Sequence, residues 1–252
     1  LNAPHTGPAP AYEVVNLGQG GADITTVLRI FAREGIRLKP DISIIISAYN
    51  NYKLFLSTDE RSFIWHVSKG LYSTSLFYAT LREKLALLRF KDNNILLYDY
   101  DVRITSEKVQ TALQYYRAAL EKIIDLSAQN GIQVVFGLQP ISLPAGLEEL
   151  QELANDQRMA ALEDQVARGR ALTYYEAMYY MQSLQIEAMI EVAAKHGVPV
   201  VDCGRLLPED KYNYFIDQVH PNESGTPFVA QAIYDFFESS ALQAETSDEP
   251  SQ

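Results

Sequence analysis

The run from Phe215 to Pro221 contains the pair of side chains best suited to acid–base chemistry in this sequence. Asp217 and His220 are three residues apart, a spacing at which both side chains can lie on one face of a helical turn. An aspartate so placed fixes the tautomer of the imidazole and supports its charged form, so His220 could serve as a general base near neutral pH. The structural alternative is a solvated aspartate and a helix-capping histidine, with Pro221 at the start of that helix.

A second candidate is the asparagine pair that follows the most apolar segment of the chain, residues 42–48. In an open α/β sheet, functional sites form at the carboxyl ends of the strands. The amide of Asn50 falls at such an end, and an amide donor there can stabilise a developing oxyanion. An asparagine-rich turn after a strand is the structural alternative. By the same placement, Gln139 after residues 132–138 is a candidate substrate contact.

A third candidate is the glycine-rich run that includes Gly18, Gly20 and Gly21. A dinucleotide-binding fingerprint requires a glycine where this chain has Asp23, whose carboxylate would repel a pyrophosphate. Two other interpretations stay open. The glycines form a tight turn with positive φ, or one N–H of the turn belongs to an oxyanion hole.

Together, the order and spacing of these runs resemble the sequence blocks of the SGNH (GDSL-type) hydrolases. Gly21 matches the glycine of the second block, and Asn50 matches the asparagine of the G-x-N-[DE] block. Asp217, His220 and Pro221 match the D-x-x-H-P block. The resemblance runs from about residue 12 to residue 238, and its middle part rests only on the order of the expected elements.

The chain departs from the family pattern in three ways. Ala48 stands where the family has glycine, and Asn51 where it has Asp or Glu. Neither G-D-S nor G-x-S-x-G occurs, so the block with the nucleophilic serine is missing. Only 11 residues precede the strand expected from Tyr12, and we therefore expect the first β-α unit to lie upstream of this fragment. Without that strand, unpaired backbone groups costing about 1–3 kcal/mol each would make the fragment poorly stable unless another segment fills the gap.

The resemblance implies an ester hydrolase that works through an acyl-enzyme. The upstream serine would attack the ester carbonyl, and His220, oriented by Asp217, would move the proton to the leaving alkoxide. The Gly21 N–H, the Asn50 side chain and the serine's own N–H would hold the oxyanion. The implied substrates are small-molecule, glycan or lipid esters, with no metal or organic cofactor. Sequence alone does not separate hydrolysis from acyl transfer.

Two non-enzymatic hypotheses are kept beside this one. The chain could be a flavodoxin-like binding module that uses residues 18–21 for a phosphate-bearing ligand. It could also be a serine-less SGNH-like protein that binds acylated glycans or a partner without hydrolysing them.

The elements that must position these residues alternate between strand and helix, which favours an α/β fold. We expect a three-layer, flavodoxin-like parallel sheet with helices on both faces and with the first β-α unit missing. The expected strands are 12–17, 42–48, 132–138 and 198–202. The clearest expected helices are 23–36, 73–90, 106–130 and 222–238, with Thr105 or Ser106 as cap of the third and Gly131 as its end.

We expect one domain over residues 12–240. A loop over residues 1–11 would lead into it, and a helical insertion over about 146–195, broken near Gly169, would interrupt it. Residues 241–252 are polar and acidic, which is typical of a disordered tail.

Composition excludes several classes of protein. The net charge of −11 over 252 residues argues against a binder of nucleic-acid backbones, which needs clustered cations. A single cysteine, Cys203, allows neither an internal disulfide nor a zinc site built from several thiolates. No apolar run reaches the roughly 18 residues of a membrane span. The compartment and the oligomeric state stay open.

Overall fold

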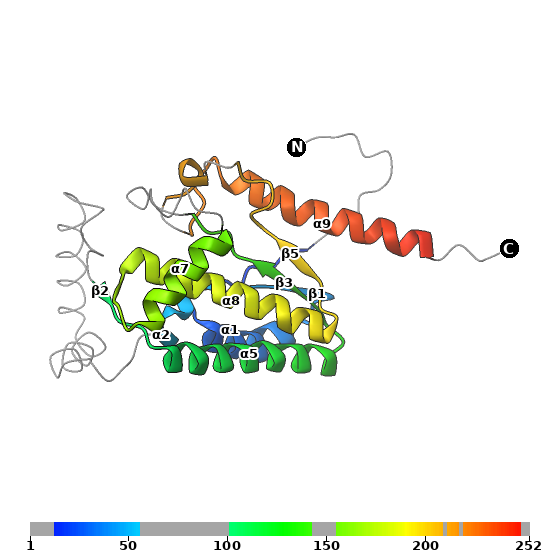
Figure 1. Ribbon diagram of the computed structural model, residues 1–252. Helices are drawn as coiled ribbons and strands as arrows, with labels where there is room; N and C mark the ends of the chain where they lie inside the picture. Colours follow the sequence, from blue (N-terminus) through cyan, green and yellow to red (C-terminus); the bar gives the residue numbers. More distant parts are fainter. Residues whose placement is uncertain (1–12, 56–100, 143–154, 209–210, 217–218, 248–252) are drawn as a thin grey trace, which may run out of the picture.

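The chain folds around a parallel β-sheet (Figure 1). The computed structural model describes residues 13–55, 101–142, 155–208, 211–216 and 219–247. Within these residues the parallel sheet has three strands in the order β1-β3-β5. They are β1 (Ile42–Ile46), β3 (Gln133–Leu138) and β5 (Val200–Asp202). Three of the four predicted strands are thereby confirmed.

The central strand β3 is packed from both sides. Its residues from Val134 to Gly137 are all buried, as expected for a continuous apolar run in a parallel sheet. Gly137 leaves room for its neighbours, because a Cβ there would lie 2.5 Å from Ile46 Cγ1 and 3.2 Å from Cys203 Sγ. The register that pairs Ile46 with Gly137 therefore requires a glycine at this position.

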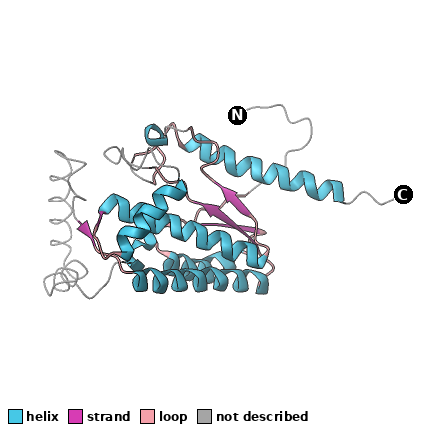
Figure 2. Cartoon of the chain, in the orientation of Figure 1, coloured by secondary structure: helices cyan, strands magenta, loops and turns pink. Residues whose placement is uncertain are grey.

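One face of the sheet is covered by three helices (Figure 2). They are α1 (Ile24–Ile30), α5 (Ser106–Gln129) and α8 (Tyr174–His196). The Thr105 side chain caps α5 by accepting a hydrogen bond from Lys108 N, which confirms the predicted start of this helix. Thr173 and Glu176 form a capping box at the start of α8. Local signals therefore fix where the two longest helices of this face begin.

Helix α9 (Thr226–Ser247) lies on the opposite face of the sheet from α1, α5 and α8 (Figure 1). Its residues Val229 and Ile233 pack against a small cluster made of Val135, Val201 and Cys203. This confirms the predicted three layers, with helices on both faces. α9 begins later than the predicted residue 222 and continues past the predicted residue 238. It takes in residues 241–247, whose Ala, Leu, Gln and Glu favour a helix over the disorder that we expected there.

β1 is an edge strand in the described part of the chain, where it pairs only with β3. Ile42, Ile44 and Ile46 are between 37% and 42% exposed. They lie on the face that α9 covers, but α9 packs over β3 and β5 and does not bury them. The expectation that this strand is buried on both faces is therefore wrong in the described structure.

The strand predicted over residues 12–17 is not present. Residues 13–19 have no regular structure, and Val14 and Val15 are 87% and 53% exposed. An apolar run becomes a strand only where a neighbouring strand satisfies its backbone groups. Among the described residues no strand pairs with this segment, which explains the failed prediction.

The helix predicted over residues 23–36 is present, but it changes type along its length. α1 passes into a single π-helical turn, η1 (Phe31–Gly35), and then into a 3-10 turn, η2 (Ile36–Leu38). The side chain of Asp23 caps α1 by accepting from Thr26 N at 2.8 Å. A capping role therefore explains the carboxylate that breaks the dinucleotide fingerprint.

The helical stretch predicted over residues 146–195 divides as expected near Gly169, which has a φ of +68°. α7 (Asn155–Ala167) precedes the break, and β4 (Leu172–Thr173) follows it and pairs with β2 (Asp101–Val102). α8 packs directly against β3 and α5 in the helix layer of the sheet. That residues 146–195 form an insertion stays a prediction. The helix predicted over 73–90 and the loop over 1–11 lie outside the described residues.

Candidate functional site

The loops that carry the candidate residues leave the sheet at one edge. The register pairs Ile46 of β1 with Gly137 of β3, and Leu138 of β3 with Asp202 of β5. The three strands are parallel, so their carboxyl ends lie next to one another. Segments 47–51, 139–142 and 203–225 therefore start from the same edge, where sites of open α/β sheets form.

The asparagine turn is the short 3-10 helix η3 (Tyr49–Asn51), directly after β1. Its first residue, Tyr49, makes two polar contacts with other elements. Tyr49 N donates to Gln139 Oε1 at 3.1 Å, and the Tyr49 and Tyr174 hydroxyls are 3.1 Å apart. The Tyr116 hydroxyl donates to the carbonyl oxygen of Ser47 just before the turn. The turn is thus tied to β3, α8 and α5 at once.

Asn50 and Asn51 occupy opposite environments in this turn. Asn51 is fully buried, and its amide bonds to Ala48 O and to Ile24 N. Asn50 is half-buried, and the residues that the structure describes offer its side chain no hydrogen-bond partner. The amide of Asn51 is therefore used within the fold, whereas that of Asn50 has no partner among the described residues. A role of Asn50 in stabilising an oxyanion stays a prediction.

Gln139 faces the asparagine turn. Its side chain accepts from Tyr49 N, and its carbonyl oxygen accepts from Gln182 Nε2 at 3.4 Å. The polar groups of Gln139 thus hold the turn and α8 together. A contact of Gln139 with substrate stays a prediction.

Gly21 lies in an exposed turn before α1, with a φ of +72°. This confirms the predicted turn with positive φ, a conformation that glycine adopts at little cost. Ala22 N donates to Gln19 O at 3.2 Å across the turn. The turn lies near the Asn50 turn, because the Asn51 side chain bonds the first residue of α1.

His220 lies in the loop between β5 and α9. The loop closes on itself through a bridge between Phe215 and Pro221, and Ile216 N donates to His220 O at 2.8 Å. Because α9 begins only at Thr226, a helix-capping role for His220 is not present. The helical turn predicted for the Asp–His pair runs partly through residues outside the described ranges and stays a prediction. Asp217 lies outside the described residues, so its orientation toward His220 stays a prediction.

The end of this loop is anchored by Asn222. Its side chain donates to Asn213 O at 2.9 Å and accepts from Ser224 N and Gly225 N. Gly225 packs tightly here, since a Cβ at this position would run into the carbonyl oxygen of Tyr214. His220 thus sits, exposed, on a loop whose two ends are fixed to each other.

Burial raises the pKa of two side chains near the sheet, Tyr116 and Cys203. It raises the pKa of Tyr116 far above its ordinary value, so this hydroxyl stays a donor to Ser47 O. Burial, helped by the charge of Asp202, raises the pKa of Cys203 to about 11. Cys203 is therefore a protonated packing residue at neutral pH and not a nucleophile.

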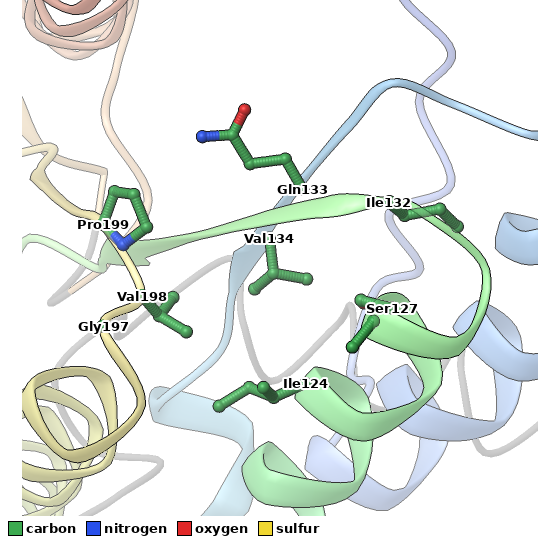
Figure 3. Close-up of a pocket in the computed structure, with 9 residues that line it drawn as sticks. Ile124, Ser127, Ile132, Gln133, Val134, Gly197, Val198 and Pro199 are labelled. Carbon is green, nitrogen blue, oxygen red and sulfur yellow. The ribbon is translucent and has the colours of Figure 1, made fainter.

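A hollow of about 240 Å³ lies at the other edge of the sheet. Figure 3 shows the residues that line it. The hollow lies where α5 ends and β3 begins, next to the turn between α8 and β5. Ile124, Ile132, Val134 and Val198 line it, and no titratable side chain does. It takes no part in the site at the carboxyl edge.

Two further findings concern ligands and membranes. In the described ranges, no group of three His, Cys, Asp or Glu side chains is placed to hold a metal ion. Among the same residues, no helix combines the length and the apolar character that crossing a membrane requires.

Comparison with known proteins finds similarity only to solved structures. No family model matches the chain, and no curated protein matches it. An α/β hydrolase enzyme from the metagenome of Lake Arreo, Spain, is 16% identical, with a TM-score of 0.47 over 87% of this chain and 69% of that one. A GDSL-like lipase from Bacteroides thetaiotaomicron is 15% identical, with a TM-score of 0.46 over 87% and 73%.

A lipase/acylhydrolase from Enterococcus faecalis is 13% identical, with a TM-score of 0.43 over 87% of this chain and 72% of that one. These scores are too low to carry a functional argument.

Proposed function

We propose that this chain belongs to an ester hydrolase in which Asn50 donates to the oxyanion and His220 acts as general base. The observation that carries the proposal is the contrast within the asparagine turn. Gln139 and Asn51 fix the turn on either side, while the amide of Asn50 is left without a partner among the described residues. A preorganised donor of this kind is what a developing oxyanion requires.

The fixed position of the Asn50 turn affects the rate of the reaction as well as the placement of the donor. A donor that is already oriented pays no reorganisation cost when the charge develops. Removing one such donor from an oxyanion hole lowers kcat by about 100- to 1,000-fold. The Gly21 N–H is the second proposed donor, from the neighbouring turn before α1.

His220 would take the proton of the nucleophile and return it to the leaving alkoxide. An imidazole suits this role because its ordinary pKa lies near neutral pH. Asp217 would hold the ring in the required tautomer. The bridge between Phe215 and Pro221 supports this role, since it fixes the backbone next to His220.

The nucleophilic serine would be carried by a further strand, N-terminal to Leu1, that pairs with the free edge of β1. Two observations support this part of the proposal. β1 has no second neighbour in the described sheet, and three of its isoleucines are partly exposed. An added parallel strand would satisfy the open backbone groups and bring its carboxyl end to the edge that holds Asn50.

The proposed chemistry uses no metal or organic cofactor. Its substrates would be small-molecule, glycan or lipid esters, and the acceptor, water or an alcohol, decides between hydrolysis and acyl transfer. The phosphate-binding alternative has no support from the turn at residues 18–21, because Asp23 places a carboxylate at the start of α1.

The test is hydrolysis of p-nitrophenyl acetate by the protein expressed with whatever residues its reading frame encodes before Leu1. Asn50→Ala and His220→Ala should each lower kcat by about 100-fold or more. Asn130→Ala and His196→Ala are matched controls at the opposite edge of the sheet and should keep wild-type rates. Wild-type rates in Asn50→Ala or His220→Ala would refute the proposal.

A further inference from the structure

Asn51 joins the two loops that hold the proposed oxyanion donors. Its side-chain oxygen accepts a hydrogen bond from Ile24 N at 2.5 Å, and its nitrogen donates to Ala48 O at 2.9 Å. The Ser47 hydroxyl oxygen lies 3.4 Å from the same nitrogen. Asn51 is 0% exposed, so water does not compete for these bonds.

The bond to Ile24 ends at the first turn of α1, where backbone N–H groups have no partner within the helix. Asp23 satisfies one of these groups, at Thr26. Asn51 satisfies another from a different part of the chain. The turn that contains Gly21 leads directly into this helix, so its position is tied to that of the Asn50 turn.

We propose that Asn51 is a positioning residue that sets the placement of the Gly21 N–H relative to the Asn50 amide. This inference rests on the proposed ester hydrolysis. Asn51 is buried and does not itself reach a substrate. Its effect would pass through the two turns that it holds together.

The chemistry of the contact explains why an amide stands here. The side chain must accept from Ile24 N on one side and donate to Ala48 O on the other. A side-chain amide does both without charge, through two separate atoms. A carboxylate would keep the first bond and set its negative charge against the carbonyl oxygen of Ala48. The two polar atoms of the Asn51 side chain therefore match the donor and the acceptor that the fold places beside them.

The expected effect falls on kcat. Misplacing a catalytic group by 1 Å can cost about 100-fold in rate. Asn51→Leu keeps the size of the side chain and loses both bonds, so kcat should fall about 10- to 100-fold while KM changes by less than about threefold. Asn51→Asp keeps the bond to Ile24 and should lose less, about threefold to tenfold.

Gln185→Leu is the matched control. Gln185 is equally buried, and among the described residues its amide donates within α8, to Met181 O. It should leave kcat unchanged. If Asn51→Leu does not fold, the kcat of Asn51→Asp is compared with that of Gln185→Leu. A lower kcat in Asn51→Asp alone supports the positioning role, and equal values overturn it.

Hydrogen exchange at the Ile24 amide gives a readout that needs no turnover. This amide should exchange at least about tenfold faster in Asn51→Leu than in the wild type, because its buried acceptor is gone. The proposal is overturned if kcat is unchanged in the Asn51 variants, or if Gln185→Leu lowers it equally. One outcome is that the wild-type protein hydrolyses no ester while Asn51 still protects the Ile24 amide from exchange. This result overturns the proposed function, and the positioning role is overturned with it. That result is distinct from an active wild type with unaffected variants.

Discussion

The two neighbouring asparagines show how burial assigns different roles to identical side chains. Asn50 and Asn51 are adjacent in sequence, and both follow the end of β1. The sequence pattern singles out Asn50 as the candidate oxyanion donor and marks Asn51 only as a departure from a motif. The role of Asn51 depends on a contact with Ile24, 27 positions away in the chain. No local pattern contains that information.

The stability of the folded chain should separate the two asparagines. Asn50→Ala removes a side chain without a partner in the described structure and should change the free energy of unfolding by less than about 0.5 kcal/mol. Asn51→Ala leaves Ile24 N and Ala48 O buried without partners and should cost about 1–3 kcal/mol. Urea unfolding of both variants measures the difference. Equal costs would show that the turn differs in solution.

Gly225 should tolerate no side chain. A Cβ at this position meets the carbonyl oxygen of Tyr214, which belongs to the backbone and cannot move aside easily. Gly225→Ala should therefore lower the free energy of unfolding by about 1–3 kcal/mol. Gly20→Ala is the control, because nothing lies within 4 Å of the added atom. A neutral Gly225→Ala in thermal unfolding would argue against the closed loop that holds His220.

Cys203 should make the stability of the protein depend on alkaline pH. Burial and the Asp202 charge raise the pKa of its thiol to about 11 in the folded state. An unfolded cysteine has a pKa of about 8.5, so the folded state holds the proton more tightly. The resulting stabilisation is complete below about pH 8.5 and is lost as pH rises toward about 11. Urea unfolding between these pH values should show a decline that Cys203→Ala reduces, and an identical decline in both proteins would contradict this.

At the scale of elements, local signals and neighbours decide which predictions hold. α5 lies within about one residue of its predicted bounds, because its cap at Thr105 and its end near Gly131 are encoded locally. The strand predicted over 12–17 fails because pairing is not local and the described sheet offers it no neighbour. α9 continues to Ser247, past its predicted end, because residues 241–247 favour a helix although their polar, acidic composition indicates disorder.

The open edge of β1 can be tested by comparing adjacent isoleucines. Ile45 is 5% exposed and faces the core, whereas Ile44 is 38% exposed on the other face. Ile45→Ala should cost about 2–5 kcal/mol of unfolding free energy, and Ile44→Ala less than about 1 kcal/mol, in the chain from Leu1 to Gln252. Similar costs in chemical denaturation would mean that another element covers Ile44 in solution.

At the scale of the whole molecule, the loops after β1, β3 and β5 all start from the carboxyl edge of the sheet. The hollow at the amino edge is lined by apolar side chains with Ser127 and Gln133, and by no titratable group. The parallel sheet and the helices on both faces followed from the sequence. The loop geometry around His220 did not, because it depends on contacts of Asn222 and Gly225 that no spacing rule predicts.

The central claim is that this chain supplies the oxyanion donor and the base to a serine carried by a strand beside β1. The most direct test is labelling of the protein, with the residues encoded before Leu1, by a fluorophosphonate that reacts only with activated serines. Mass spectrometry should locate the label on a serine N-terminal to Leu1, and His220→Ala should abolish labelling while His196→Ala does not. A label on a serine within residues 1–252, or no label on the folded wild-type protein, would contradict the account.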